Sequence, residues 1–567
     1  MTTASIALRD VRMARDKDDW LVLGLLAAFA VFMVLAVALP IATIFLRSLH
    51  DSSGAYVGFA NYRSYLGTPA LLQSVFNSFL VSGLTTLIVL VLAFTYAYAL
   101  TRSCMPGRPF FKAMTMVPLL TPGLLKAIAL VYWFGNQGVL KSWLFGESIY
   151  GPIGIVMASV LWTLPHAILI LTAALLLSDA RLYEAAQSLK AGRGRTFRIV
   201  TLQGVKYGLV ATAVFVFIRV FTEFGIPKVI GGKFNVLATD VYKEVVGQQN
   251  FEMGAVVSIV LLIPAILAFL IDRKVSSRQS AALSARSVPY TPKPSRALDT
   301  TMFVYCSLVT VVMLAVIGMG QFAAVVKFWP YNLEFTWAHY QFNMEGVGWE
   351  NFWNSLLLAA CVATFGTAMS FLSAYLVEKP KRDAAGRQLL QAVALLPMAI
   401  PGLVLGLGYL LVINRPGSML GGLYGTMTIL VVVTIVHYYT IAHLTSTTAL
   451  KAIDREFEAV GASMKVPMVR CFARITVPVC APALVEIWSY LFLNAMTTVS
   501  GVIFLYGIHT KLASLAVLHM DEAGRQASAA AMAMLIVYAC VVVRILQVLI
   551  SGSLIARLQK WRAPTHA

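Results

Sequence analysis

The stretch from Trp20 to Leu46, WLVLGLLAAFAVFMVLAVALPIATIFL, holds no charged residue and decides which solvent surrounds the chain. A helix needs about 20 apolar residues to cross the hydrocarbon of a bilayer. A cleaved signal peptide has an apolar region of only about 7–15 residues. We therefore expect an uncleaved membrane-spanning helix, preceded by a basic segment that contains Arg9, Arg12, Arg15 and Lys17.

The composition of the 567 residues leads to the same conclusion. Hydrophobic residues make up 59% and charged residues 12%, with a mean hydropathy of +0.78. Soluble domains carry about 25% charged residues, so we expect a lipid bilayer around this chain. The net charge of +19 does not require nucleic acid as a partner, because cytoplasmic loops of membrane proteins collect Lys and Arg.

Twelve stretches are long and apolar enough to span a membrane. They are approximately 20–47, 75–100, 111–134, 152–177, 206–226, 253–272, 301–325, 353–377, 389–413, 426–448, 479–499 and 527–549. We expect an all-α membrane protein with about 12 transmembrane helices and with both termini in the cytoplasm. Of the 44 Lys and Arg residues, 31 lie in segments that this topology makes cytoplasmic and 9 in external segments, which follows the positive-inside rule.

The two halves of the chain repeat each other in sequence. Two pairs recur at an offset of 277, Asn77-Ser78 as Asn354-Ser355 and Ala97-Tyr98 as Ala374-Tyr375. Four residues recur at an offset of 279, with Pro118, Pro122, Gly123 and Gly138 repeated as Pro397, Pro401, Gly402 and Gly417. We expect two parallel six-helix repeats with a transport pathway between them.

A segment rich in Ser, Pro and basic residues, 273–300, interrupts the hydrophobic pattern almost at mid-chain. Such a composition predicts a flexible cytoplasmic linker. The expected organisation is a cytoplasmic segment 1–19, a first half 20–272 with its core from about 75, the linker, a second half 301–550 with its core from about 353, and a cytoplasmic tail 551–567.

Each half carries one predicted cytoplasmic loop with the same order of acidic, small and basic residues. The first loop contains Asp179, then Glu184-Ala185-Ala186 and Gly192, and the second contains Asp454, then Glu458-Ala459-Val460-Gly461. Acidic residues suit the positive end of a helix, and small residues let another surface approach closely. Arginines that snorkel to lipid head groups would explain the basic charge, but not the recurrence of this order.

These loops resemble the EAA loop of type I ABC importer permeases, which work with a solute-binding protein. Glu184, Ala185 and Ala186 match its start, but Lys190 stands where that family has Gly, and Gln203 replaces its Pro. In the second loop the match at Glu458 and Ala459 is looser, and Gly461 comes early. The resemblance covers roughly 75–230 and 353–505.

The resemblance implies partners that the sequence does not itself contain. Each loop would form a coupling helix that docks on an ATPase subunit, so the chain would bind two copies of an ABC ATPase that uses ATP-Mg. A periplasmic binding protein would deliver the solute, and the chain would lie in a bacterial inner membrane as a multi-pass protein.

The transported solute is expected from the same resemblance. The arrangement of two permease halves fused in one chain resembles that of ferric-iron importers. The stretches 224–240 and 457–482 are most similar to 2-aminoethylphosphonate permeases. We expect a phosphonate such as 2-aminoethylphosphonate, with ferric iron, another small ion or a polyamine as the alternative.

Motifs of enzymes are absent from the sequence. It has no GxxxxGK[ST] phosphate loop, no HExxH pair and no GxSxG elbow, and its six cysteines are scattered. We therefore expect no catalytic residue, no metal site, no disulfide and no cofactor bound by this chain. An ion-driven secondary transporter shares the twelve spans and parallel repeats, but it has no need of the paired loops.

Ionisable residues within spans are costly and mark candidate functional sites. Lys126, Arg219 and Glu223 lie in predicted spans. Arg219 and Glu223, four residues apart on one helix face, could satisfy each other as a structural pair. Alternatively, Arg219 and Lys126 could line a pathway for an anionic or zwitterionic solute. Pro122 and Pro401 would kink their helices, either to shape a cavity or to form a flexing gate.

Overall fold

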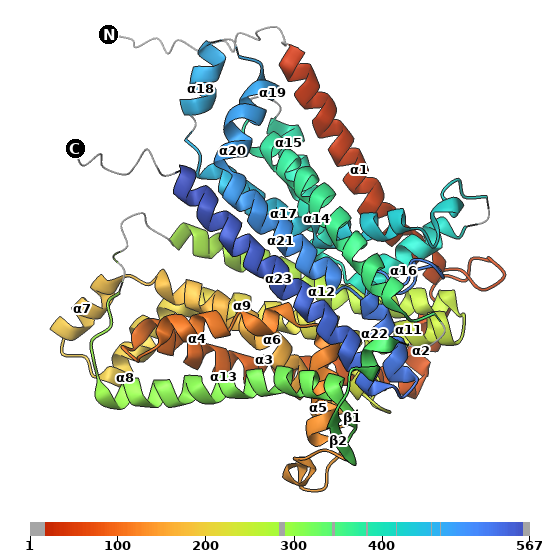
Figure 1. Cartoon of the computed structure of the whole chain (residues 1–567). Helices are drawn as coiled ribbons and strands as arrows, with labels where there is room; N and C mark the ends of the chain where they lie inside the picture. Colours follow the sequence, from red (N-terminus) through yellow and green to blue (C-terminus); the bar gives the residue numbers. More distant parts are fainter. Residues whose placement is uncertain are drawn as a thin grey trace.

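The computed structural model describes residues 17–282, 288, 290–342, 346–380, 384–415, 417–454, 456–464 and 466–558. Most of the predicted N-terminal segment 1–19 and part of the tail 551–567 lie outside the described residues. Long helices dominate the described part of the chain, as Figure 1 shows.

The first half begins at α1, a helix that covers the opening apolar stretch. Its helices are α1 (Lys17–Ser48), α2 (Ala60–Gly67), α3 (Pro69–Arg102), α4 (Arg108–Met114), α5 (Gly123–Phe134), α6 (Pro152–Leu176), α7 (Ala180–Ser188), α8 (Arg193–Thr196), α9 (Gln203–Phe221), α10 (Gly225–Ile230), α11 (Leu237–Tyr242) and α12 (Phe251–Ala282). Short 3-10 or π turns lie at η1 (Val117–Leu120), η2 (Lys141–Leu144), η3 (Phe197–Leu202) and η4 (Lys243–Gly247).

The second half begins at α13 and has a similar series of elements. Its helices are α13 (Arg296–Val325), α14 (Trp349–Glu378), α15 (Ala384–Leu395), α16 (Gly402–Ile413), α17 (Met427–Lys451), α18 (Glu456–Ser463), α19 (Met468–Cys471), α20 (Val477–Val479), α21 (Ala481–Met496), α22 (Ala513–Glu522) and α23 (Gln526–Leu558). The strands are β1 (Val326–Phe328) and β2 (Asn332–Phe335), and the turns are η5 (Ala338–Gln341), η6 (Leu396–Ala399), η7 (Gly421–Leu423) and η8 (Phe472–Thr476).

Nine helices in the described part of the chain are long and apolar enough to cross a membrane, or up to twelve if each of three bent pairs is one span. Each of the twelve predicted stretches overlaps one of these. The bent pairs meet at Pro122, Pro401 and Cys480, with angles of 98°, 106° and 76°. Proline cannot donate a backbone hydrogen bond and ends or kinks the helix before it, which explains the first two breaks.

Some local features recur at matching positions of the two halves. The breaks before α5 and α16 fall at the repeated Pro-Gly pairs, Pro122-Gly123 and Pro401-Gly402. The segment that leads from each basic loop into the next long helix also contains a π turn. This turn is η3, between α8 and α9, in the first half and η8, between α19 and α20, in the second. Wide turns of this kind are rare and occur often at functional sites.

The first helix of each half packs against the other half. Helix α1 lies along α15 and α16, and α13 lies along α5. The Tyr409 hydroxyl donates a hydrogen bond to the Ala36 carbonyl at 2.8 Å, and a Cβ on Gly408 would lie only 2.7 Å from that of Pro40. The halves are therefore separate in sequence but interlocked in space.

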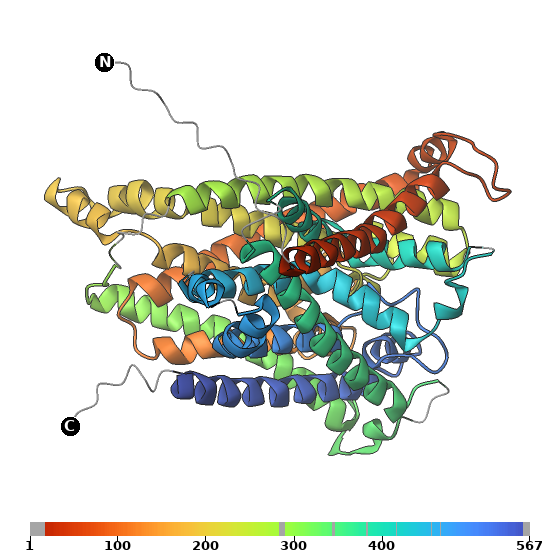
Figure 2. The same cartoon turned by 90° about the horizontal axis from the view of Figure 1, so that it is seen from above.

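The two half bundles diverge toward one side of the molecule in Figure 1. We call the side that carries α7, α8, α18 and α19 the basic end, and the side that carries α11, α22 and the β-strands the hairpin end. Seen from above in Figure 2, the long helices of both halves run in broadly one direction. The halves therefore meet at the hairpin end, and their basic ends lie apart.

A two-stranded antiparallel hairpin, β1–β2, is a departure from the all-α prediction. Aromatic and β-branched residues favour strands, and this loop contains several. The Trp329 indole donates to the Gln137 carbonyl at 3.1 Å, and the Gln137 amide to the Tyr331 hydroxyl at 3.3 Å. The hairpin of the second half thus covers the loop that follows α5 of the first.

The predicted linker 273–300 is shorter than expected. Helix α12 continues to Ala282 and α13 begins at Arg296, because serine and arginine are acceptable inside a helix. Residues 283–287 and 289 lie outside the described part, while Tyr290 and the residues that follow it lie against the first half.

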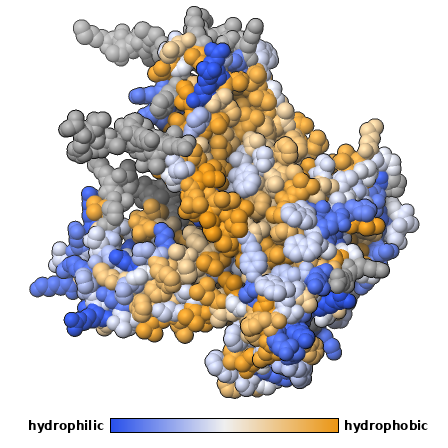
Figure 3. Space-filling model, viewed as in Figure 1, coloured by the Kyte–Doolittle hydropathy of each residue, from blue (hydrophilic) through white to orange (hydrophobic). Residues whose placement is uncertain are grey.

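The surface agrees with a membrane location. In Figure 3 apolar side chains cover much of the visible face over the long helices, while hydrophilic ones gather around α7 and α8 and at the loops. Exposed apolar residues along one helix, such as Val304, Leu308 and Val311 of α13, are 60–64% exposed, as lipid-facing side chains would be.

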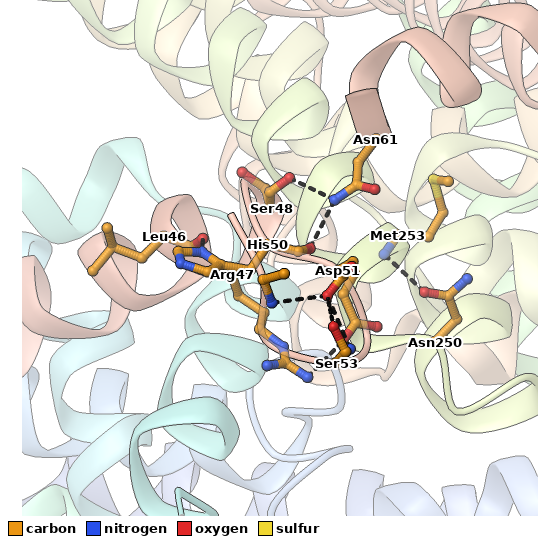
Figure 4. A network of polar contacts seen from close by, with 11 residues as sticks. Leu46, Arg47, Ser48, His50, Asp51, Ser53, Asn61, Asn250 and Met253 are labelled. Carbon is orange, nitrogen blue, oxygen red and sulfur yellow. Dashed lines mark hydrogen bonds and ion pairs between the residues drawn. The ribbon is translucent and has the colours of Figure 1, made fainter. Parts of the chain in front are cut away.

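A polar network anchors the loop after α1 (Figure 4). The Asp51 carboxylate accepts hydrogen bonds from the Ser53 hydroxyl at 2.6 Å and from the Ala55 backbone N–H at 2.9 Å, and these bonds lower the pKa of Asp51. The Asn61 amide donates to the carbonyls of Ser48 and His50. Arg47 pairs with Glu252, which ties the end of α1 to the start of α12.

Candidate functional site

The first candidate site is the α7 loop at the basic end. Asp179 caps this helix, because its carboxylate accepts a hydrogen bond from the Arg181 N–H at 3.1 Å. Glu184 and Ala185 are exposed and Ala186 is half-buried, while Leu182 is 53% and Leu189 82% exposed. A short helix that presents apolar residues beside a carboxylate has the character of a protein-docking surface.

The turn after α7 shows how the chain turns without the glycine that the EAA loop has at the position of Lys190. Lys190 has a φ of 51°, in the left-handed region that glycine adopts most easily. The Ala191 N–H donates to the Ala186 carbonyl at 2.9 Å, which closes the helix in the way a glycine usually does. Gly192 is extended and starts α8, so Lys190 itself takes the conformation of the missing glycine.

The α18 loop closes in the same way in the second half. The Val466 N–H donates to the Gly461 carbonyl at 2.9 Å, so Gly461 corresponds in space to Ala186 of the first loop. Glu458 then lies one residue before the position equivalent to Glu184, while the side chains of Glu458 and Ala459 lie outside the described part. A Cβ on Gly461 would lie 3.0 Å from the Cys471 sulfur, which explains a small residue there.

Residues of the linker between α12 and α13 hold α7 in place. The Ala180 N–H donates to the Val288 carbonyl at 2.9 Å, and the rings of Tyr183 and Tyr290 are 4.5 Å apart. The Arg102 guanidinium lies 4.7 Å from the centroid of the Tyr290 ring. The first loop is therefore fixed to the end of α3 and to the linker.

The second candidate site surrounds the break before α5. Pro122 caps α5, and Lys126 in the next turn is only 2% exposed. The Lys126 ammonium donates to the carbonyls of Pro118 and Thr121, both at 3.0 Å. The break frees these carbonyls, so Lys126 stabilises the bent chain. This burial does not fit the hypothesis that its side chain lines an open pathway.

Arg219 and Glu223 do not share a helix face, contrary to the prediction. Helix α9 ends at Phe221, so Glu223 lies in the break before α10. Its carboxylate accepts hydrogen bonds from the N–H groups of Gly225 at 3.1 Å and Ile226 at 3.4 Å. The Arg219 guanidinium lies 4.6 Å from the centroid of the Trp162 ring, a cation–π contact.

Arg219 also lies close to the second half. It interacts electrostatically with His437 and Tyr438 of α17 and with Tyr490 of α21. These side chains are half-buried, as is His166 of α6. The cluster of Arg219, Trp162, His166, His437, Tyr438 and Tyr490, which we call the aromatic cluster, therefore joins both halves.

The sequence pointed to Arg219 but not to most of its neighbours. His166 and His437 are polar residues within spans, but a lone histidine in a span more often makes a structural hydrogen bond than binds a ligand. Trp162, Tyr438 and Tyr490 carry no local signal, because aromatic residues are common in spans. Pro401 caps α16, and a Cβ on the adjacent Gly402 would lie 3.0 Å from the His437 ring.

Comparison with known proteins places this chain in a family. Residues 105–281 and 366–555 match the family described as "Binding-protein-dependent transport system inner membrane component". The chain belongs to this family. The two matches cover both halves, so this importer permease carries the family's domain twice, and it is a multi-pass protein of the inner membrane.

Curated relatives of this permease transport different solutes. It is 24% identical over 537 residues to the ferric transport system permease protein FbpB of Actinobacillus pleuropneumoniae, covering 92% of this chain and 77% of that protein. It is 26% identical over 276 residues to the spermidine/putrescine permease PotB of Haemophilus influenzae, covering 46% and 96%. It is 30% identical over 162 residues to the molybdenum permease ModB of Escherichia coli K12, covering 27% and 69%. These relatives are permease subunits of importers and not enzymes.

Proposed function

We propose that this permease forms the passage for a small anionic or zwitterionic solute, such as 2-aminoethylphosphonate, which a periplasmic binding protein delivers. The observation that carries the proposal is Arg219, a half-buried cation at the contact between the halves. A cation in a span is costly unless it serves a pathway or finds a partner. The Arg219 guanidinium stacks on Trp162 and interacts electrostatically with Glu223, and arginine N–H groups are suited to binding an oxyanion.

We further propose that the basic end faces the cytoplasm and that the α7 and α18 loops bind two copies of an ATPase. Exposed Leu182, Glu184 and Leu189 on α7 support docking. The closing hydrogen bonds at Ala191 and Val466 make the two loops similar in shape. ATP-Mg would be bound and hydrolysed by the partner.

Ferric iron is the second candidate solute. The relation to FbpB extends over 92% of this chain, which favours it on grounds of overall similarity. In that case a binding protein would deliver the cation, and Arg219 would face a compensating anion or serve only to hold the halves together.

A growth experiment separates the two candidates. A strain that lacks the permease gene is grown on 2-aminoethylphosphonate as sole phosphorus source and, separately, under iron limitation. Failure on the phosphonate alone, restored by the intact gene, is the expected result. Failure under iron limitation alone would replace the phosphonate by ferric iron.

A further inference from the structure

An ion pair joins the two halves at the hairpin end. The Lys228 ammonium, on α10 of the first half, lies 2.7 Å from a Glu522 carboxylate oxygen on α22 of the second half. The same ammonium lies 4.7 Å from the centroid of the Tyr242 ring, at the end of α11. One lysine therefore contacts three short helices, two of the first half and one of the second.

Lys228 follows Arg219, a member of the aromatic cluster, by nine residues in the sequence. Helix α10 begins where Glu223 receives hydrogen bonds from Gly225 and Ile226, and Lys228 follows within the next turn. A separation of α10 from α22 would therefore also move the short helix whose first N–H groups donate hydrogen bonds to Glu223.

Other titratable groups surround the pair on the second half. His519, in the turn before Glu522, interacts electrostatically with Lys228, Glu522 and Lys511, and its ring nitrogen lies 3.3 Å from the Tyr506 hydroxyl. Asp521 interacts with Glu522. The pair thus lies among titratable groups of the second half, and Tyr242 of the first half also interacts with Glu522.

We propose that Lys228 and Glu522 form a latch that keeps the hairpin end closed between the halves and must separate before solute can pass from that side. The half bundles diverge toward the basic end (Figure 1), so α10 and α22 lie where the halves meet. The side chains are 22% and 37% exposed, and ion pairs between partly exposed side chains are weak. A latch of this strength holds the resting state and can still be opened by a docked binding protein.

The test measures how readily the hairpin end opens. Ser500, beside Gly402 and the His437 ring, is replaced by Cys as a reporter in the full chain within native membranes. A membrane-impermeant maleimide is then added from the periplasmic side without solute or ATP. Lys228→Gln and Glu522→Gln should each increase the labelling rate about two- to fivefold, and the charge-reversed pair K228E/E522K should restore the original rate.

A matched control and a second readout keep the outcome clear. Lys233, exposed in the segment between α10 and α11, loses its charge in Lys233→Gln and should leave the rate unchanged. Unchanged labelling in both Lys228→Gln and Glu522→Gln, with normal amounts of protein in the membrane, would overturn the latch.

The latch rests on the proposed orientation, which the same reagent tests separately. Faster labelling seen only in inside-out vesicles would support the latch but would place the hairpin end in the cytoplasm, against the proposed function.

Discussion

The Ser78 hydroxyl accepts a hydrogen bond from the Leu237 backbone N–H at 2.9 Å, so a side chain on α3 caps α11. Ser355 on α14 accepts the equivalent bond from Ala513, the first residue of α22, at 2.8 Å. The preceding asparagines also match, because Asn77 donates to the Asn235 carbonyl and Asn354 to that of His509, both at 2.9 Å. The repeated Asn-Ser pair therefore fixes a short helix of the hairpin end in each half.

Replacing either serine by alanine should destabilise the protein. The first N–H of a helix has no intrahelical partner, and leaving it buried and unpaired costs about 1–3 kcal/mol. We expect Ser78→Ala and Ser355→Ala each to lower the apparent melting temperature in detergent. Thr448→Ala is the control, because that exposed hydroxyl bonds only to its own helix. Equal apparent melting temperatures for all three variants would contradict the capping role of the two serines.

Reversing charge on the coupling loops should weaken binding of the ATPase. Glu184 is exposed on α7, and a cationic side chain there would meet whatever surface the carboxylate complements. We expect Glu184→Lys and Glu458→Lys to reduce copurified ATPase by about tenfold, equivalent to 1.4 kcal/mol. Glu147→Lys, an exposed site outside the loops, should have no effect. Normal copurification and transport in both loop variants would refute the coupling role.

Lys190→Gly should stabilise the α7 turn. A residue with a side chain is strained in the left-handed conformation that Lys190 adopts at φ 51°, and glycine is not. The expected gain is about 0.5–1 kcal/mol, reduced by the greater freedom of the unfolded chain. Lys112→Gly, within helix α4, should instead lose about 1 kcal/mol. Thermal unfolding of both variants distinguishes these effects by their opposite signs.

Removing the cation at the contact between the halves should impair transport more than stability. We expect Arg219→Gln to lower the initial rate of solute uptake about tenfold, a loss of about 1.4 kcal/mol of interaction. Arg544→Gln serves as the comparison, because that half-buried arginine of α23 bonds to Gln547 of its own helix. If uptake by the Arg219 variant is normal while its membrane level is unchanged, the arginine does not act on solute.

Stability should depend on pH through Asp240 of α11. Burial is the main cause that raises the pKa of Asp240 to about 6 from 3.8, opposed by the hydrogen bond from Ser74 and the charge of Lys243. The folded protein therefore binds this proton more tightly than the unfolded chain, so stability falls as the pH rises from about 4 to above 6.

Asp240→Asn should remove this penalty. The gain at pH 8 is on the order of 1–3 kcal/mol, with almost no gain at about pH 2, which is well below the pKa of 3.8 in the unfolded chain, so that both states are protonated. Melting temperatures of the variant and the unchanged protein at the two pH values give the comparison. A gain of equal size at both pH values would show that ionisation of Asp240 is not the cause.

The sequence determined the features that depend on neighbouring residues. Twenty or so apolar residues predict a span wherever they lie, because the transfer of each from water to lipid adds to the same local sum. The Pro122-Gly123 and Pro401-Gly402 breaks follow equally from local chemistry, since proline removes a helical hydrogen bond whatever packs around it.

Only the tertiary structure decided which distant side chains meet. Glu223 lies beyond the end of α9, where it accepts hydrogen bonds from N–H groups of α10 and interacts electrostatically with Arg219, which itself stacks on Trp162 of α6. The pairing of Lys228 with Glu522 joins residues almost 300 positions apart. Each such contact is worth about a kilocalorie. That is too little to leave a pattern in the sequence, and the contact depends on how the interlocked halves pack.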